Sequence, residues 1–174
     1  MKQAPTATAS ARGLRVAILR SLFNQPVSDG LVAGARAALA EMGGAAAVVY
    51  DVPGAFELPL AAKAAAESGR FDAVVALGAV IQGDTDHYDH VAREAAAGLA
   101  RAALDTGVPV AFGVLTVREA RQAEERAMPG PGNKGAEAAR AAVMLAATLR
   151  AIRGRAVASG ARRRRPVGSR GKRR

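Results

Sequence analysis

Residues Phe71-Asp72-Ala73-Val74-Val75-Ala76-Leu77 are almost wholly apolar and open into the glycine-bearing segment 78–85, and they give the clearest indication of the fold. A short apolar run of this kind is typical of a strand that is buried on both faces of a parallel sheet. Three further β-type runs occupy residues 15–19, 46–52 and 108–115. Ala-rich stretches with helical spacing separate the runs, which is the pattern of βαβ units. The sequence therefore predicts an α/β fold with a central, mainly parallel four-stranded sheet.

Glycine, proline and capping residues predict where the helices begin and end. A first helix starts near Ser28 and closes at Gly43-Gly44. The segment Thr116-Val117-Arg118-Glu119 has the spacing of a capping box for a later helix, which residues 128–132 (MPGPG) then break. The remaining helices are expected at residues 58–66, from about 85 to 105 and from about 134 to 152.

The composition excludes several kinds of chemistry. The 174 residues suit one domain and include no Cys, which excludes disulfides, thiolate catalysis and zinc–sulfur sites. Two His residues are too few for a metal site built of histidines alone, and we expect no metal. No apolar run is long enough for a signal peptide or a membrane span. We therefore expect a cytoplasmic protein that makes no membrane contact.

The net charge of +10 comes from the C-terminal end of the chain. From Arg150 onward there are 11 of the 25 Lys and Arg residues and no acidic residue, so positions 1–149 hold 14 basic and 15 acidic residues. We expect a flexible segment 1–13, a folded domain 14–153 and a disordered basic tail 154–174. The tail is either a solvated extension or a salt-sensitive site for an anionic partner such as RNA.

Each predicted strand carries residues that suit a ligand site, and ligands of open parallel sheets bind beyond the carboxyl ends of the strands. Phe23 and Asn24 follow the first strand, residues 53–57 (PGAFE) the second and residues 83–87 (GDTDH) the third, while Phe112 lies in the fourth run. Three of the four Phe residues thus occur in or next to these segments. They favour a platform for a flat heterocycle, and the alternative is that they fill space where loops meet helices.

The third strand end suits a phosphate group. Gly83-Asp84-Thr85 precedes a helix, where free backbone N–H groups, a hydroxyl and the helix dipole attract anions, although many such turns are only helix caps. Arg126 is a candidate for a bidentate phosphate contact, or else a surface charge beside two glutamates. His87 is a candidate proton carrier near neutral pH, or else an exposed or structural histidine.

Four segments follow one another in a fixed order. They are Val52-Pro53-Gly54-Ala55-Phe56-Glu57-Leu58-Pro59, Gly78-Ala79-Val80-Ile81-Gln82-Gly83-Asp84-Thr85-Asp86-His87-Tyr88-Asp89, Phe112-Gly113-Val114-Leu115-Thr116, and Glu125-Arg126-Ala127 with Gly132-Asn133-Lys134-Gly135. In order and spacing these segments resemble the lumazine synthase family, and the resemblance extends over about residues 14–149.

The resemblance implies a flavodoxin-like three-layer sandwich whose subunits form pentamers, often joined into larger particles. It also implies a condensation of 5-amino-6-(D-ribitylamino)uracil with 3,4-dihydroxy-2-butanone 4-phosphate. The product is 6,7-dimethyl-8-ribityllumazine, a precursor of riboflavin, and phosphate and water are released. No cofactor or metal is required, and riboflavin synthase is a candidate partner.

Most of the site that the resemblance implies comes from one subunit. The pyrimidine and its ribityl chain would contact Phe23, Ala55, Phe56, Glu57, Ala79, Val80 and Ile81. Among these, Phe23 stacks on the ring and Glu57 accepts hydrogen bonds from hydroxyls. Asp84 and Thr85 bind the phosphate, the former through its backbone N–H, and His87 transfers protons.

A neighbouring subunit completes the implied site with Phe112, Arg126 and Lys134, of which Arg126 clamps the phosphate. The chain departs from the family pattern at Ser21-Leu22, where Gly-Arg is usual, at Gln82, where arginine is common, and at residues 128–131, where Gly-Thr-Lys is frequent. None of these departures falls on a residue assigned to chemistry.

Two other functions are compatible with the sequence. One is an oligomeric shell or scaffold whose basic tail binds an anionic partner such as RNA, with catalysis weak or lost. The other is a flavodoxin-like module that binds a nucleotide or flavin and turns nothing over.

Overall fold

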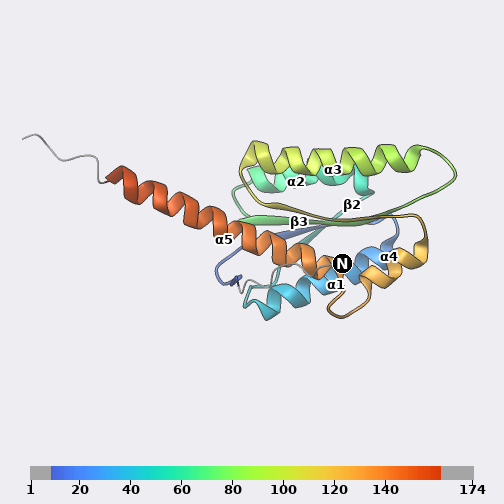
Figure 1. Ribbon diagram of the computed structural model, residues 1–174, viewed down its shortest axis with the longest axis horizontal. Helices are drawn as coiled ribbons and strands as arrows, with labels where there is room; N and C mark the ends of the chain where they lie inside the picture. The colour runs from blue at the N-terminus through green and yellow to red at the C-terminus, as the bar shows by residue number, and fades with distance from the viewer. Residues whose placement is uncertain (1–8, 162–174) are drawn as a thin grey trace, which may run out of the picture.

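A four-stranded parallel sheet forms the centre of the computed structural model, which describes residues 9–161 (Figure 1). The elements in chain order are β1 (Val16–Ser21), α1 (Gln25–Glu41), β2 (Val48–Val52), the 3₁₀ helix η1 (Ala55–Glu57), α2 (Leu58–Glu67), β3 (Ala73–Ile81), α3 (His87–Thr106), β4 (Val110–Val117), α4 (Ala120–Ala127) and α5 (Lys134–Ala161). The strands lie in the order β2-β1-β3-β4, and each neighbouring pair is parallel. The predicted α/β fold with a flavodoxin-like three-layer arrangement is confirmed.

The predicted burial of the apolar run at residues 71–77 is also confirmed, because β3 lies between β1 and β4 and is buried from Ala73 to Val80. Its side chains alternate between the two faces of the sheet. Val75 and Leu77 pack with α1, α4 and α5, whereas Val74 and Ala76 pack with α2 and α3. Two hydrophobic cores, one on each side of the sheet, therefore hold the three layers together (Figure 1).

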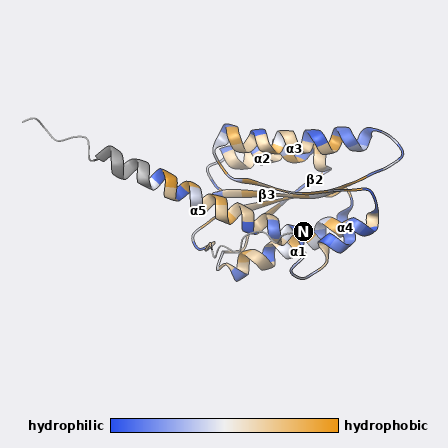
Figure 2. Cartoon of the chain, viewed as in Figure 1, coloured by the Kyte–Doolittle hydropathy of each residue, from blue (hydrophilic) through white to orange (hydrophobic). Residues whose placement is uncertain are grey.

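Hydropathy follows these layers. Figure 2 shows mainly hydrophobic strands, with hydrophilic residues gathered on α4 and on the first turns of α3. Buried alanines such as Ala35 and Ala38 on α1 and Ala139 and Ala142 on α5 let these two helices pack closely beside the sheet. Within residues 9–161, no helix combines the length and the apolar character needed to cross a membrane.

The element boundaries differ from the predictions where tertiary pairing extends a strand. β3 continues to Ile81 and β4 to Val117, because these two residues are partners at the end of a continuous parallel ladder. The predicted position of the capping box is therefore wrong, since Thr116 and Val117 belong to β4. The capping box of α4 lies three residues later: the Glu119 side chain accepts from the Gln122 N–H, and the Glu119 N–H donates to Oε1 of Gln122 at 3.3 Å.

The described structure continues past the predicted domain limits, residues 14–153, at both ends. Ala11 is fully buried, and its N–H donates to the Met42 carbonyl at 2.9 Å, so the body begins before residue 14. Helix α5 continues to Ala161 instead of ending near residue 152. A single Gly154 costs a helix only about 1 kcal/mol, and the Ala and Arg residues around it favour helix. Residues 1–8 and 162–174, which include most of the predicted tail, lie outside the described residues.

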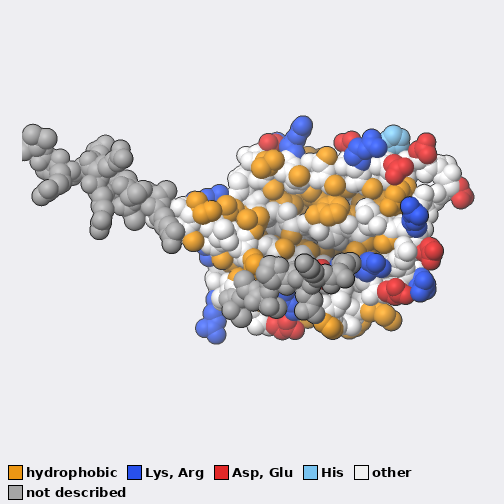
Figure 3. Space-filling model, in the orientation of Figure 1, with side chains coloured by type: hydrophobic (Ala, Val, Ile, Leu, Met, Phe, Trp, Pro, Cys, Tyr) orange, Lys and Arg blue, Asp and Glu red, His pale blue; other side chains and the backbone are white. Residues whose placement is uncertain are grey.

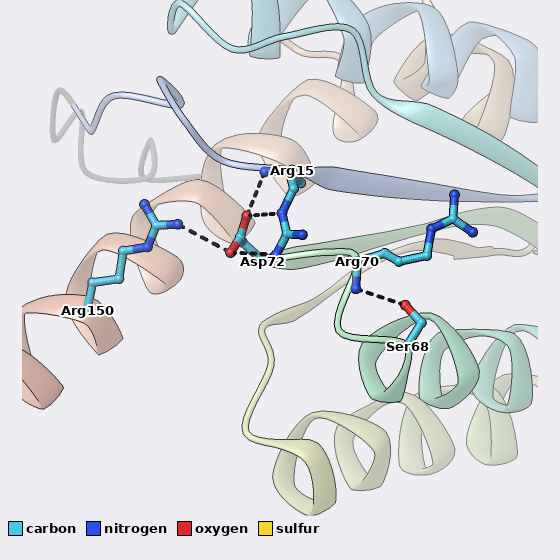
Figure 4. A network of polar contacts seen from close by, with 5 residues as sticks. All are labelled: Arg15, Ser68, Arg70, Asp72 and Arg150. Atoms are coloured by element: carbon cyan, nitrogen blue, oxygen red, sulfur yellow. Dashed lines mark hydrogen bonds and ion pairs between the residues drawn. The ribbon is translucent and has the colours of Figure 1, made fainter.

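Asp72 joins β1, the start of β3 and α5 at the amino ends of the strands (Figure 4). Its Oδ2 accepts hydrogen bonds from the N–H and the Nε of Arg15 at 2.8 and 3.1 Å, and Nη2 of Arg150 lies 3.3 Å from Oδ1. Burial alone would raise the pKa of Asp72, but the hydrogen bonds from Arg15 and the charges of both arginines outweigh it and hold this pKa below its usual value. The Arg70 N–H nearby donates to Oγ of Ser68 at 3.2 Å, just beyond α2.

Candidate active site at the carboxyl ends of the strands

The loop after β1 is fastened to the loop after β2. The Leu22 N–H donates to the Val52 carbonyl at 2.9 Å, and the Phe23 N–H donates to the Pro53 carbonyl at 3.1 Å. These bonds continue the pairing of β1 with β2 past the ends of both strands. The Phe23 backbone is thereby fixed, while its side chain is 71% exposed. A phenyl ring held by its backbone and left open to solvent suits a stacking partner.

Asn24 connects the same loop to β3. It has a left-handed backbone (φ 58°, ψ 45°), the only positive φ of a residue other than glycine among residues 9–161. Asparagine tolerates this conformation better than most residues. Its Nδ2 donates to the Ala79 carbonyl at 3.0 Å. Strand residues two apart present their backbone groups to the same side, so the backbone N–H and C=O of Ile81 point, like the Ala79 carbonyl, toward the first loop.

The loop after β2 forms η1 and carries three of the predicted residues. Ala55 is buried, whereas Phe56 is 57% exposed and Glu57 is also exposed. The Glu57 carboxylate lies back over Gly54, where an added Cβ would be 3.0 Å from Oε2. The second loop therefore presents another ring and a carboxylate at the edge where Phe23 lies.

The loop after β3 leads into α3. The Gln82 N–H donates to the Val117 carbonyl at 2.9 Å, and residues 82–87 are all exposed. Helix α3 begins at His87, with Asp86 as its N-cap and no side-chain capping bond. Asp84 and Thr85 therefore lie just outside the helix, at its positive end. Because α3 begins two residues later than predicted, the backbone N–H groups of Asp84 and Thr85 lie outside the helix and are open to an anion.

An ion-paired group braces the first loop. Arg20, one residue from the end of β1, donates from Nε and Nη2 to both oxygens of Asp51 on β2 at 2.8 Å, and its Nη1 binds Asp29 on α1. The hydrogen bonds from Arg20 hold the pKa of Asp51 below its usual value despite partial burial. Arg20 thus fixes β1, β2 and the start of α1 relative to one another.

Three predicted residues lie apart from these loops. Phe112 pairs with Ala76 in the middle of β3, five residues before Val117, so it is about 16 Å short of the strand end at a rise of about 3.3 Å per residue. Its side chain is 46% exposed on β4, an edge strand. Figure 3 shows hydrophobic side chains gathered on this face, between α3 and α5. Phe112 therefore faces outward from its own subunit.

Arg126 and Lys134 lie on the side of the sheet opposite to α3. Nη1 of Arg126 donates to the Gln122 carbonyl at 2.8 Å, and Nζ of Lys134 donates to Oε1 of Glu137 at 2.7 Å. Each side chain is thus held on its own helix. Among residues 9–161, neither makes a hydrogen bond or ion pair to the loops after β1, β2 and β3.

Sequence reasoning missed the structural role of Asn133, which it identified only as part of a matching segment. Asn133 is 1% exposed and binds the end of α4, the start of α5 and α1. An Asn directly before a helix is a known N-cap pattern. Its contacts to other elements have no counterpart in the local sequence.

A cavity of about 130 Å³ lies at the opposite end of the sheet, next to Asp72, Gly107 and Arg153. Its charged groups already have partners, because Asp72 binds Arg15 and Nη2 of Arg153 donates to the Gly107 carbonyl at 2.8 Å. We therefore identify the loops at the carboxyl ends, and not this cavity, as the candidate active site. No group of three His, Cys, Asp or Glu residues in the described part of the chain is arranged to hold a metal ion.

The loops after β2 and β3 contain two of the four segments that resemble one enzyme family. A family model described as 6,7-dimethyl-8-ribityllumazine synthase matches residues 13–150. The match includes all four strands, the helices α1 to α4 and most of the described part of α5. The chain therefore belongs to the 6,7-dimethyl-8-ribityllumazine synthase family.

Proposed function

We propose that this chain condenses 5-amino-6-(D-ribitylamino)uracil with 3,4-dihydroxy-2-butanone 4-phosphate to form 6,7-dimethyl-8-ribityllumazine, releasing phosphate and water. The observation that carries the proposal is the gathering of the loops after β1, β2 and β3 at one sheet edge, two of which contain family segments. Backbone bonds from Leu22 and Phe23 join the first loop to the second, and Asn24 joins it to β3. Family membership over residues 13–150 supports the choice of these two substrates for the site at this edge.

The pyrimidine would lie between the first and second loops. Two exposed rings, Phe23 and Phe56, are available there, and Phe23 would stack on the heterocycle. The backbone of residues 79–81, part of which faces the first loop, would contact the ring edge. Ala55 would close the base of the site, and the exposed Glu57 carboxylate would accept hydrogen bonds from the ribityl hydroxyls.

The phosphate would lie at the start of α3. Asp84 and Thr85 precede a helix of 20 residues, whose dipole and free N–H groups favour an anion. Asp84 would contribute its N–H, because its own carboxylate would repel a phosphate. His87 is the first residue of the helix and would lie next to the reacting carbon atoms, where an imidazole can move protons near neutral pH.

A second copy of the chain would supply Phe112, Arg126 and Lys134. In the described part of the chain Arg126 and Lys134 bind groups of their own helices, and Phe112 lies exposed on an edge strand. A head-to-tail arrangement of identical subunits brings one face of each copy against a different face of the next and closes into a ring. We therefore propose a homopentamer, as in the family, with one site at each subunit contact.

The chemistry needs positioning more than activated groups. The amine of the pyrimidine attacks the ketone carbon, water leaves and an imine forms. The carbon–oxygen bond to phosphate then breaks, and the second nitrogen closes the ring with loss of water. Holding two reactants in place can correspond to an effective molarity of about 10⁵ M or more. Proton transfer by His87 would add a factor of about 10²–10⁴.

The direct test is an assay of the purified full chain with both substrates, following the absorbance of the lumazine product. We expect product formation without added metal or cofactor, and equimolar release of inorganic phosphate. A chain that binds the pyrimidine or a flavin but forms no lumazine would be a binding module, and the proposal would fail.

A further inference from the structure

The Asn133 side chain occupies a fully enclosed position between three helices. Its Nδ2 lies 2.8 Å from the Ala127 carbonyl and 3.1 Å from the carbonyls of Met128 and Gly30. Its Oδ1 accepts the Ala136 N–H at 3.0 Å. A primary amide has two N–H hydrogens, so three carbonyls already exceed its donors. With its N–H hydrogens engaged and only 1% of its surface exposed, Asn133 is enclosed by the helices and does not face a substrate.

Two of the three carbonyls that Asn133 binds, those of Ala127 and Met128, belong to the end of α4. The last carbonyls of a helix have no partner within that helix. Ala127 and Met128 follow Arg126 directly, and Met128 has an extended backbone (ψ 148°) that ends α4. Lys134, the first residue of α5, follows Asn133. One side chain thus joins the turn that carries Arg126 to the turn that carries Lys134.

Two glycines leave the space in which α1 and α5 pack around the Asn133 side chain. A methyl group on Gly34 of α1 would overlap with Oδ1 of Asn133, and a methyl group on Gly135 would overlap with the Leu31 carbonyl. The connection between α4 and α5 includes Pro129 and Pro131, which have no N–H to donate. Because this connection has few bonds of its own, the Asn133 amide is its main attachment to the body.

We propose that Asn133 is a positioning residue, which fixes the end of α4 against α5 and so holds Arg126 in place for the phosphate of a neighbouring subunit. The proposal rests on the proposed function, because it takes Arg126 as part of the site. Arg126 is held on its own helix by the Gln122 carbonyl. Its position therefore depends on how α4 and α5 are joined.

The test is the variant Asn133→Ser in the full chain. Serine keeps an N-cap oxygen for the Ala136 N–H but is too short to reach the carbonyls of α4 and α1. We expect the KM for 3,4-dihydroxy-2-butanone 4-phosphate to rise about tenfold or more, because small displacements of positioning groups are costly. The KM for the pyrimidine should stay within about twofold, since its contacts come from the other loops. Equal changes in both KM values would overturn the proposal.

A matched control separates positioning from general loosening of α5. Val143→Ala removes buried packing from α5 and leaves the Asn133 contacts in place. If Val143→Ala lowers the thermal midpoint as much as Asn133→Ser and raises the phosphate-substrate KM equally, Asn133 has no specific role. If Asn133→Ser does not fold, Gly30→Ala replaces it, since its methyl group would meet the Ala127 carbonyl at 2.6 Å. A folded Gly30→Ala with the wild-type KM would equally overturn the proposal.

Calorimetric titration with inorganic phosphate distinguishes failure of the proposal from failure of the proposed function. We expect Asn133→Ser to weaken phosphate binding about tenfold, in line with the KM effect. If the wild-type chain forms no lumazine but Asn133→Ser still weakens phosphate binding, the reaction is wrong and the positioning role holds. If phosphate binds both proteins equally, the positioning role is wrong whatever the activity.

Discussion

The two ends of the parallel strands use their polar groups in opposite ways. At the amino end, Asp72 binds Arg15 and Arg150, and Arg153 binds the Gly107 carbonyl. At the carboxyl end, residues 82–87 are exposed, and so are the rings of Phe23 and Phe56. The same sheet therefore has one end whose charges satisfy each other and one end whose polar groups and rings face solvent.

This difference has an energetic meaning. Burying a Phe side chain contributes about 1.5–3 kcal/mol, and the carboxyl end forgoes this gain for two rings. A fold keeps such exposed apolar groups where a ligand or another subunit covers them. We therefore expect substitutions at the carboxyl end to change turnover, and substitutions at the amino end to change stability.

The largest effect is expected from His87→Ala. Loss of the proposed proton carrier should slow lumazine formation by about 10²–10⁴-fold and leave measurable activity, because positioning of the two reactants supplies the rest. His90→Ala, one turn further along α3, should keep nearly the wild-type rate. Steady-state assays of the three proteins, with their oligomer size checked by light scattering, measure this. Complete loss of activity in an intact oligomer would contradict this division of labour.

Arg126→Ala should have the next largest effect. Removal of one charged donor from a phosphate site typically lowers kcat/KM by about 10²–10³-fold. Arg121→Ala is the matched control, because Arg121 is on the same helix and forms an exposed ion pair with Glu125. An equal decrease of kcat/KM in both variants would show that the charge of α4 matters and not a contact of Arg126. An unchanged kcat/KM in Arg126→Ala would contradict its role in the phosphate site.

Asp72→Asn should change stability and not turnover. Loss of its charged hydrogen bonds should cost about 1–2 kcal/mol at neutral pH, and thus lower the Tm by a few degrees. The pKa of Asp72 is lowered by folding, so its contribution is present above the unfolded value of 3.8 and is lost as the pH falls below about 4. Thermal melts should show a smaller loss of Tm on acidification for Asp72→Asn than for the wild type. If acidification lowers the Tm of both proteins equally, a group other than Asp72 is responsible for the loss of stability at low pH.

Removal of residues 162–174 should have the smallest effect on turnover. These residues hold 8 of the 11 basic residues that follow position 149, whereas every residue of the candidate site lies before them. We expect the same rate of lumazine formation with and without the segment. RNA binding measured for both proteins at low and moderate salt tests the alternative role of the tail. A difference that disappears at moderate salt would support an anionic partner.

The sequence predicts the sheet well because its strands are local features. The apolar run that ends at Leu77 requires burial on both faces, and the structure buries it. Strand ends are harder, since the extension of β4 to Val117 depends on pairing with Ile81 and not on the residues themselves. For the same reason the helix cap is at Glu119 and not at Thr116.

The candidate site is only partly predictable for a similar reason. The sequence places Phe23, Phe56 and His87 after strands, and parallel strands bring such positions to one edge. The contact of Asn24 with Ala79 and the contacts of Asn133 with α1 and α4 join residues far apart in the chain. No local pattern contains these contacts. Phe112 is exposed in the middle of a strand, and only the family resemblance gives it a role.

In the proposed oligomer, the loops of one subunit and the Arg126 of the next complete one site. Co-expression of His87→Ala and Arg126→Ala chains, followed by purification of mixed oligomers through two different tags, tests this shared site. In a head-to-tail ring, about a quarter of the sites in a random mixture would combine intact loops with an intact arginine. Lumazine formation should therefore recover to roughly a quarter of the wild-type rate. A mixed oligomer whose rate equals the mean of the two variants would contradict the shared site.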